Sequence, residues 1–186
     1  MEADWEVEIG GDAPVIDAHW TGFVDLRRNP ERVGELPEAA QLPGLAYALL
    51  QLNHRHAPVW TAKCDVWPIE DPGSLDPDEF DAPRESTVHG LACYIDLLPK
   101  SDQQWLFLAK TVAEAKTICA LLRMVPLPCC RADLILRRAF LTPDLEDTGI
   151  TAYVTACGKT ANEASQTLQA ALKAFADTLL SHSTLK

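Results

Sequence analysis

Asp17 and His19 are the residues whose types and spacing are best suited to chemistry. They are two positions apart in an expected strand over Val15–Leu26, so their side chains share one strand face. A carboxylate beside an imidazole can orient the ring and hold its proton for general acid–base catalysis. The sequence shows no nucleophile, glycine-rich loop or second histidine to accompany them. The pair is therefore a weak candidate for a catalytic site.

The stretch Pro14–His19 resembles the first-strand motif of metal-dependent amidohydrolases. In that family a second histidine follows two positions later and completes a metal-binding pair, whereas here that position is Thr21. The chain of 186 residues is also shorter than the roughly 250 residues of the barrel that such enzymes use. The resemblance covers the strand motif and does not extend to the second metal ligand.

Other residues of metal-binding type do not have the spacing of a closed metal site. Cys129 and Cys130 are adjacent, so strand geometry sends them to opposite faces, and the histidines of segment 54–56 have no paired partners. Asp76 and Asp78 match the start of a calcium loop, but the glycine and the glutamate that complete such a loop are missing. We expect no metal and no cofactor.

The expected strands can be sorted into two rows of side chains, because alternate residues of a strand point to opposite faces. One row is apolar, and we expect it to lie under helices: Ile16, Ala18, Trp20, Val24, Leu26, Trp60, Ala62, Cys64, Val66, Leu91, Cys93, Ile95, Leu97, Ile150, Ala152, Val154 and Ala156. The opposite row mixes aromatic and charged residues, as interface centres do. Its candidate binding residues are Phe23, Lys63, Asp65, Trp67, Tyr94, Asp96, Arg137 and Tyr153. The sequence thus predicts a contact face, with a plain solvated face as the alternative.

The pattern Lys-Thr-x-x-Glu-Ala occurs twice, at residues 110–115 and 159–164. In each copy the threonine hydroxyl can accept a hydrogen bond from the N–H three residues on, while the glutamate reaches back to the threonine N–H, which forms a capping box. Apolar residues follow at helical spacing, as far as Pro126 after the first copy and Leu179 after the second. Each copy therefore predicts the start of an amphipathic helix.

Strands are expected before each of these helices. Residues 131–141 and 150–157 precede the second helix, and residues 88–97 and 103–109 precede the first. The sequence predicts a ββα unit that is used twice. A single helix over 102–124 is an alternative to the strand at 103–109, because Ser101 begins another capping box and the apolar stripe continues through it.

The first third of the chain predicts a strand over 15–26, a helix over 43–53 and a strand over 59–67. We expect a single α+β domain over residues 1–186. Its fold class is a two-layer sandwich of a mainly antiparallel sheet with helices on one face, containing repeated ββα units, with a ferredoxin-like or related topology. Residues 68–86 form a long, acidic, proline-rich loop with seven carboxylates and one arginine.

The net charge of −11 repels phosphate backbones and anionic lipids, so we expect no nucleic-acid partner and no membrane partner. The segment Met1–Glu6 is acidic where a secretory signal would be basic, which favours the cytoplasm and six reduced cysteines. The leading hypothesis is a non-catalytic binding or oligomeric module that uses the mixed face, with a protein partner or a homo-oligomer. The alternatives are an acidic inhibitor or immunity-type protein that docks a basic partner, and a small enzyme at Asp17 and His19.

Overall fold

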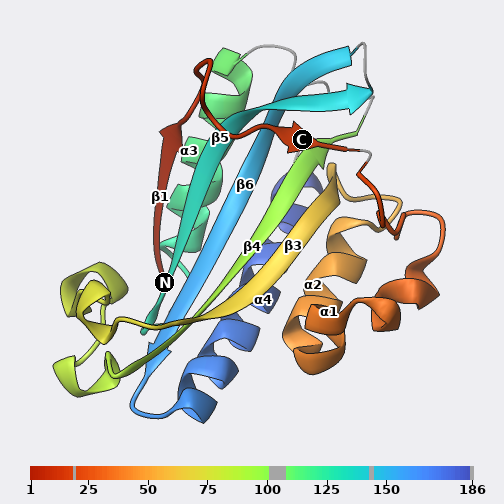
Figure 1. The fold of residues 1–186 in the computed structure, drawn as a ribbon. Helices are drawn as coiled ribbons and strands as arrows, with labels where there is room; N and C mark the ends of the chain where they lie inside the picture. The colour runs from red at the N-terminus through yellow and green to blue at the C-terminus, as the bar shows by residue number, and fades with distance from the viewer. Residues whose placement is uncertain (19, 101–107, 143–144, 185–186) are drawn as a thin grey trace.

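A six-stranded sheet forms one layer of the protein, and helices form the other (Figure 1). The computed structural model describes residues 1–18, 20–100, 108–142 and 145–184. The strands are β1 (Glu2–Val7), β2 (Ile16–Asp17), β3 (Val59–Ile69), β4 (His89–Pro99), β5 (Cys130–Thr142) and β6 (Leu145–Gly158). The helices are α1 (Pro37–Gln41), α2 (Pro43–Leu52), α3 (Leu108–Leu122) and α4 (Ala161–Thr184), with 3₁₀ turns at Pro30–Glu35, Pro72–Ser74, Pro77–Phe80 and Arg84–Ser86.

The strand order is β1-β5-β6-β4-β3, and the pairs β5–β6, β6–β4 and β4–β3 are antiparallel. β1 and β2 each pair in parallel with β5, at different points along that strand. Helices α3 and α4 pack behind the sheet as drawn in Figure 1, and α2 packs against α4. The expected mixed α+β class, with a mainly antiparallel sheet, is confirmed.

Helix α4 begins where the second capping pattern predicts. The N–H of Glu163 donates to Oγ1 of Thr160 at 3.2 Å, and the Glu163 carboxylate accepts from the N–H of Lys159 at 2.9 Å rather than from that of Thr160. The apolar stripe of this helix is buried against the sheet, with Phe175 and Leu168 fully enclosed. Local capping and periodicity were therefore enough to locate α4.

The first capping pattern lies inside α3 and not at its start, because the helix already includes Leu108 and Ala109. The strand expected over 103–109 is therefore wrong at its last two residues, and residues 101–107 lie outside the described ranges. The two edges of β4 are occupied by β3 and β6, so the expected pairing of 88–97 with 103–109 is not formed along β4. The ββα repeat and the ferredoxin-like topology are not confirmed.

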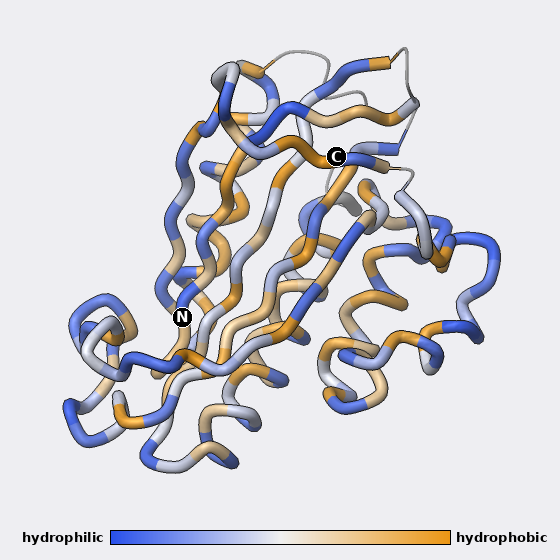
Figure 2. The backbone as a smooth tube through the Cα atoms, viewed as in Figure 1, coloured by the Kyte–Doolittle hydropathy of each residue, from blue (hydrophilic) through white to orange (hydrophobic). Residues whose placement is uncertain are grey.

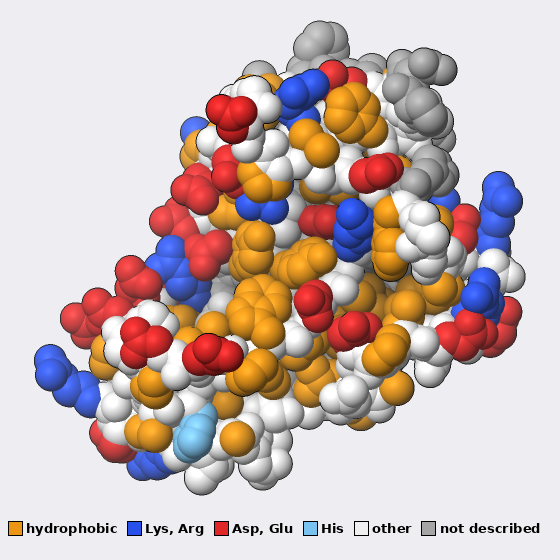
Figure 3. Space-filling view, viewed as in Figure 1, with side chains coloured by type: hydrophobic (Ala, Val, Ile, Leu, Met, Phe, Trp, Pro, Cys, Tyr) orange, Lys and Arg blue, Asp and Glu red, His pale blue; other side chains and the backbone are white. Residues whose placement is uncertain are grey.

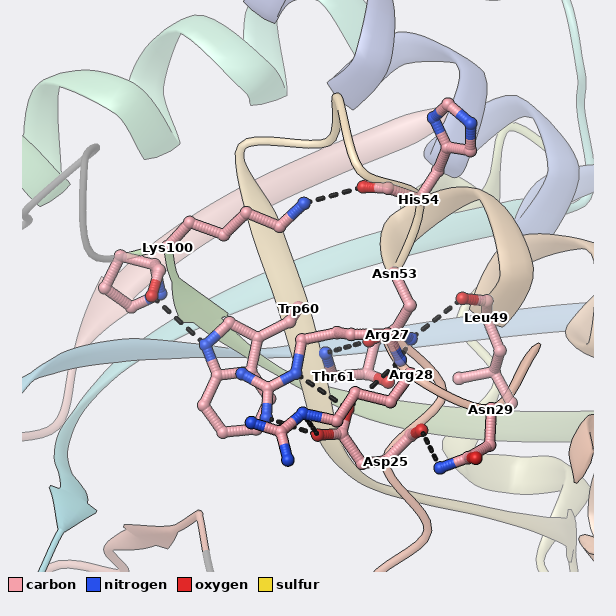
Figure 4. Close-up of polar contacts among 11 residues, drawn as sticks. Asp25, Arg27, Arg28, Asn29, Leu49, Asn53, His54, Trp60, Thr61 and Lys100 are labelled. Atoms are coloured by element: carbon pink, nitrogen blue, oxygen red, sulfur yellow. Dashed lines mark hydrogen bonds and ion pairs between the residues drawn. The ribbon is translucent and has the colours of Figure 1, made fainter.

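A β-bulge in β3 reverses the predicted facing of Trp60 and Ala62. The pairing with β4 shifts between Thr61 and Cys64, so the alternation of faces changes there. Trp60 and Ala62 consequently lie in a small core on the side of the sheet away from the helices, whereas Cys64 packs toward the helices as predicted. The buried Asn53 side chain stabilises this arrangement by donating to Thr61 Oγ1 at 2.7 Å (Figure 4).

The strand predicted over 15–26 is reduced to Ile16–Asp17. Gly22 has a φ of +95°, a backbone conformation that favours glycine and interrupts extended structure. Ile16 instead packs across the sheet onto Gly149, where an added Cβ would lie 2.7 Å from the isoleucine Cδ1. Gly149 lies inside β6, and residues 143–144 lie outside the described ranges.

The segment after β2 is fixed to the small core by Arg27. Its guanidinium lies 3.8 Å from the centre of the Trp60 ring and is held by two hydrogen bonds to Asp25, as Figure 4 shows. The Trp60 indole N–H donates to the Pro99 carbonyl at 3.2 Å. These contacts close one end of the sheet face that the helices leave uncovered.

The acidic segment 68–86 folds onto the opposite end of that same face. Leu75 and Phe80 are buried there against Cys157 of β6. Pro68 belongs to the end of β3. The first two 3₁₀ turns of the segment begin after Asp71 and Asp76, whose carboxylates accept backbone N–H groups. Between the two covered ends, the middle of the sheet remains open, and in Figure 2 hydrophilic and hydrophobic colours alternate along its strands.

Candidate functional site

Three aromatic side chains meet in the middle of the open face, which is the sheet face opposite α3 and α4. Trp67 of β3, Tyr94 of β4 and Tyr153 of β6 have ring centroids 6.0 to 6.3 Å apart. Each ring is only partly buried. At these separations the rings contact one another in tilted and edge-on arrangements. We call them the aromatic trio, and they form a continuous platform rather than a hollow cage.

Strand register places carboxylates at both ends of the row that contains the tyrosines. The row follows the paired residues from strand to strand: Asp4 on β1, Asp133 on β5, Tyr153 on β6, Tyr94 on β4 and Asp65 on β3. Neighbouring strands are ~4.8 Å apart, so this row is roughly 19 Å long. The row therefore presents two phenol rings between acidic groups, and we call it the tyrosine row.

A chain of hydrogen bonds lies beside the tyrosine row. On the same face, Thr151 and Asp96 are one step along the strands from that row, and Arg137, which pairs with Gly149, is two steps along. Arg137 donates to the Glu8 carboxylate at 2.7 Å and to Thr151 Oγ1 at 3.2 Å, and the Thr151 hydroxyl donates to Asp96 Oδ1 at 2.6 Å. Arg137 also lies 5.7 Å from the centre of the Tyr153 ring. Only 13% of the Arg137 side chain is exposed. The guanidinium thus connects the edge strand β1 to the interior of the open face.

A groove of about 530 Å³ lies beside the aromatic trio, between β1, β5 and β6. Its polar lining consists mainly of Asp4, Glu6, Glu8, Arg131, Asp133 and Arg137, and Tyr153 forms part of its wall. Arg131 is bound by Asp133 at 2.8 Å and by Glu79 of the acidic segment at 3.4 Å. In Figure 3 hydrophobic side chains gather over the middle of this face, with carboxylates around them. We call the groove between β1, β5 and β6 the β1 groove.

The electrostatic surroundings of the open face favour neutral rather than reactive side chains. Burial raises the pKa of Tyr94 to about 12, so its phenol keeps its proton at neutral pH. At the end of this face that segment 68–86 covers, burial likewise raises the pKa of the Cys157 thiol to about 12, which leaves it protonated and poorly nucleophilic. The arrangement therefore suits contact and hydrogen bonding better than nucleophilic or general-base chemistry.

Asp96 is 6% exposed, and burial raises its pKa above the ordinary 3.8, against the opposing effects of Thr151, Arg137 and Lys63. Between the pKa of Asp96 in the unfolded chain and its higher pKa in the folded protein, the folded protein binds more protons, so stability falls as pH rises through that window.

We expect Asp96→Asn, which can still accept the Thr151 hydrogen bond, to be more stable than the natural protein at pH 7. The advantage should shrink below about pH 4. Urea unfolding at both pH values measures this, and an advantage independent of pH would contradict it.

Most residues of the predicted contact face do lie on one face of the structure. Asp65, Trp67, Tyr94, Asp96, Arg137 and Tyr153 are all on the open face. Lys63 sits in the bulge, 5.6 Å from the centre of the Trp20 ring. Phe23 packs at the covered end, with its ring centroid 6.0 Å from that of Trp60, and is separate from the aromatic trio.

Of the suggested catalytic pair, the structure describes Asp17 alone. Asp17 is exposed in β2, which pairs with the end of β5, and His19 lies outside the described residues. Trp20 leaves the expected apolar row, since it is 39% exposed and its indole N–H donates to the Ala62 carbonyl at 3.1 Å, whereas Val24 packs against the main core.

The strand β1 supplies Asp4, Trp5 and Glu6 to the β1 groove and was not predicted. Glu2, Asp4, Glu6 and Glu8 alternate with the apolar residues of the segment, which is the period-two signal of a half-buried strand. That signal was present in the sequence.

The fold and the open face define a mixed α+β protein with a six-stranded sheet and an exposed aromatic and acidic surface. No protein-family model matches the chain, and searches of curated proteins and of solved structures find no match either. In the described part of the chain, no cluster of three histidine, cysteine or carboxylate side chains could hold a metal ion. None of the helices in the described ranges has both the length and the apolar character needed to cross a bilayer.

Proposed function

We propose that this protein is a non-catalytic binding module whose open sheet face docks a basic partner protein. The observation that carries the proposal is the tyrosine row, in which Tyr94 and Tyr153 lie partly exposed between the carboxylates of Asp65 and Asp133. Aromatic rings beside carboxylates attract cationic side chains through both cation–π and ion-pair interactions.

The charge of the open face is complementary to a basic surface. Its carboxylates are Asp4, Glu6, Glu8, Asp65, Asp96 and Asp133, and its bases are Lys63, Arg131 and Arg137. Both arginines are already engaged by carboxylates of this face, so neither presents an uncompensated positive charge. Glu79 of segment 68–86 adds a further carboxylate at the rim of the groove. A partner therefore meets a surface of net negative charge.

The same charge argues against the homo-oligomer as the use of this face. A two-fold dimer places the same surface patch of each copy against the other, so its carboxylates would oppose one another. Addition of a strand to an edge of the sheet is also opposed. On the edge strand β1, the carboxylate of Asp4 accepts a hydrogen bond from the Trp5 N–H at 2.8 Å. On the edge strand β3, the carboxylate of Asp65 accepts one from the Val66 N–H at 2.7 Å. An added strand would have to compete with these carboxylates for the two backbone donors.

The acidic inhibitor hypothesis agrees with this proposal and differs only in the partner's activity. Its predicted docking segment, 68–86, contributes Glu79 to the same surface. The enzyme hypothesis finds no comparable support, because Asp17 is apart from the aromatic trio at the end of β5, and burial keeps the Tyr94 phenol protonated.

A pair of charge reversals tests the proposal. Asp65→Lys on the open face and Asp12→Lys in an exposed turn change the net charge equally. We expect Asp65→Lys to weaken binding of a labelled nona-arginine peptide by about tenfold, since it places a cation beside the trio, and Asp12→Lys to weaken it less than about twofold. Fluorescence anisotropy at low salt, repeated at 0.5 M salt, measures both. Equal weakening by the two variants would show that net charge alone controls the association and would refute a docking face.

A further inference from the structure

Cys129 and Cys157 lie opposite each other at the end of β5 and β6 that segment 68–86 covers. The outermost ladder pair at this end is Cys130 with Ala156, so the next pair outward is Cys129 with Cys157. The N–H of Cys157 donates to the Cys129 carbonyl at 2.9 Å, which continues the ladder by one step. The Cys157 thiol donates to the same carbonyl oxygen at 3.5 Å, although the two residues are 28 positions apart in the chain. They are therefore cross-strand neighbours.

The two cysteine side chains share one small cluster. Both pack with Leu75 and Phe80 of segment 68–86. Cys129 has a φ of +63°, which ends the strand there, and its N–H donates to the Phe80 carbonyl at 2.9 Å. Burial is the main cause that raises the pKa of the Cys157 thiol to about 12, and a side-chain hydrogen bond with Cys129 adds to the shift. The two thiols are thus in contact with each other.

The separation of this pair suits a disulfide. Residues that face each other across an antiparallel pair have Cα atoms ~4.5 to 5.5 Å apart, and a disulfide spans about 4.4 to 6.8 Å. Cys64 and Cys93 differ, because Cys64 pairs with Ile95 and Cys93 with Val66. They are diagonal neighbours, whose Cα atoms lie ~7 to 8 Å apart, beyond the reach of a disulfide.

The adjacent Cys130 is turned away from Cys157. Its side chain is buried in the main core, and its thiol donates to the Leu127 carbonyl at 3.3 Å. Cys129, in contrast, is half-buried, so a reagent in solvent can reach it, whereas Cys157 is 0% exposed. The pair therefore combines one accessible thiol with one enclosed thiol beside it.

We propose that Cys129 and Cys157 form a redox-sensitive pair, which a low-molecular-weight disulfide such as glutathione disulfide converts to a cross-link that stabilises this end of the sheet. The site lies under segment 68–86, apart from the aromatic trio, and does not depend on the docking proposal.

The reaction proceeds by two thiol–disulfide exchanges. Cys129 loses its proton and attacks one sulfur of glutathione disulfide, whose S–S bond breaks, and the departing glutathione thiolate takes up the proton. Cys157 then loses its proton and attacks the Cys129 sulfur of the mixed disulfide, which releases the second glutathione as a thiol. Two protein thiols are oxidised and one glutathione disulfide is reduced to two thiols. Contact between the two sulfurs favours the second step, in which the attacking thiol is mostly protonated.

The cross-link joins the two open ends of the β5–β6 hairpin. It also fixes the position of Cys129, whose N–H holds Phe80 of segment 68–86. Because a cross-link between residues 28 positions apart restricts the unfolded chain, we expect the oxidised protein to have a Tm about 5 to 10 °C above that of the reduced protein.

Peptide mapping of the oxidised full chain tests the proposal. Trypsin places Cys129 within residues 124–131 and Cys157 within residues 139–159. After the folded protein is incubated with glutathione disulfide and its free thiols are blocked, mass spectrometry should find these two peptides joined. Cys129→Ser should abolish the joined product. Cys130→Ser, which removes the other thiol of the same peptide, should retain it.

Each other outcome would overturn the redox pair. These are no oxidation of the pair, a glutathione adduct on Cys129 without a cross-link, and a joined product that persists in Cys129→Ser. A cross-linked protein with the Tm of the reduced protein would overturn its stabilising role. The bond is mapped in the unaltered chain, so the result holds even where a variant fails to fold.

Discussion

The double variant Tyr94→Ala/Tyr153→Ala should bind the nona-arginine peptide about thirtyfold more weakly than the natural protein, a loss of about 2 kcal/mol. Both rings belong to the aromatic trio, and each is partly exposed in the middle of the tyrosine row. Truncation removes the surface on which a guanidinium stacks while it leaves the carboxylates in place. The expected loss is thus larger than that of any single charge, because binding at such faces concentrates on central aromatic residues.

Tyr47→Ala is the matched control. Tyr47 is also a partly exposed tyrosine, but it lies on α2, where its hydroxyl donates to Asp177 at 2.7 Å and Lys173 is 5.1 Å from its ring centre. We expect this variant to bind the peptide within about twofold of the natural protein. Circular dichroism confirms that each variant is folded. A double variant that is folded and binds normally would remove the aromatic trio from the proposal.

Arg137→Met should lower the free energy of unfolding by about 2 kcal/mol, because it removes a largely buried arginine that binds Thr151 and the Glu8 carboxylate, and solvent screens the 42% exposed Glu8. The methionine retains much of the side-chain volume, but Glu8 and Thr151 lose their donor. Asp96, which is buried and bound by Thr151, loses the arginine that favours its charged form. The variant tests whether the hydrogen-bond network of Arg137 stabilises the sheet.

The neighbouring Arg138→Met provides the comparison. Arg138 pairs with Glu146 near the β5–β6 turn, where 34% of the arginine side chain and 49% of the glutamate side chain are exposed. Solvent screens such a pair, so we expect a loss below about 1 kcal/mol. Urea titration of both variants measures the difference. Equal losses would mean that the Arg137 network contributes no more than a surface ion pair.

The open face could be predicted from the sequence because strand alternation is a local property. The β4 and β6 rows follow a period of two without interruption, so Tyr94 and Tyr153 were assigned to the face where the structure has them. Helix α4 was equally predictable, since its capping residues and its apolar stripe are all within one segment.

The parts that could not be predicted depend on contacts between distant segments. The bulge after Thr61 shifts the register of β3 and moves Trp60 to the other face, and no local residue pattern marks it. The pairing of β1 with β5 joins residues that are about 130 positions apart, so it became visible only in the fold. The β1 groove, which depends on that pairing, was missed with it.

The most direct measurement of the central claim is an NMR titration of the isotope-labelled protein with the nona-arginine peptide at low salt. The account predicts that backbone and indole shifts concentrate on Trp67, Tyr94 and Tyr153 and on β1, and that they are small on α2 and α4. Shifts centred on α2 and α4, or spread evenly over the acidic surface with no preference for the open face, would contradict the claim that this face is the docking site.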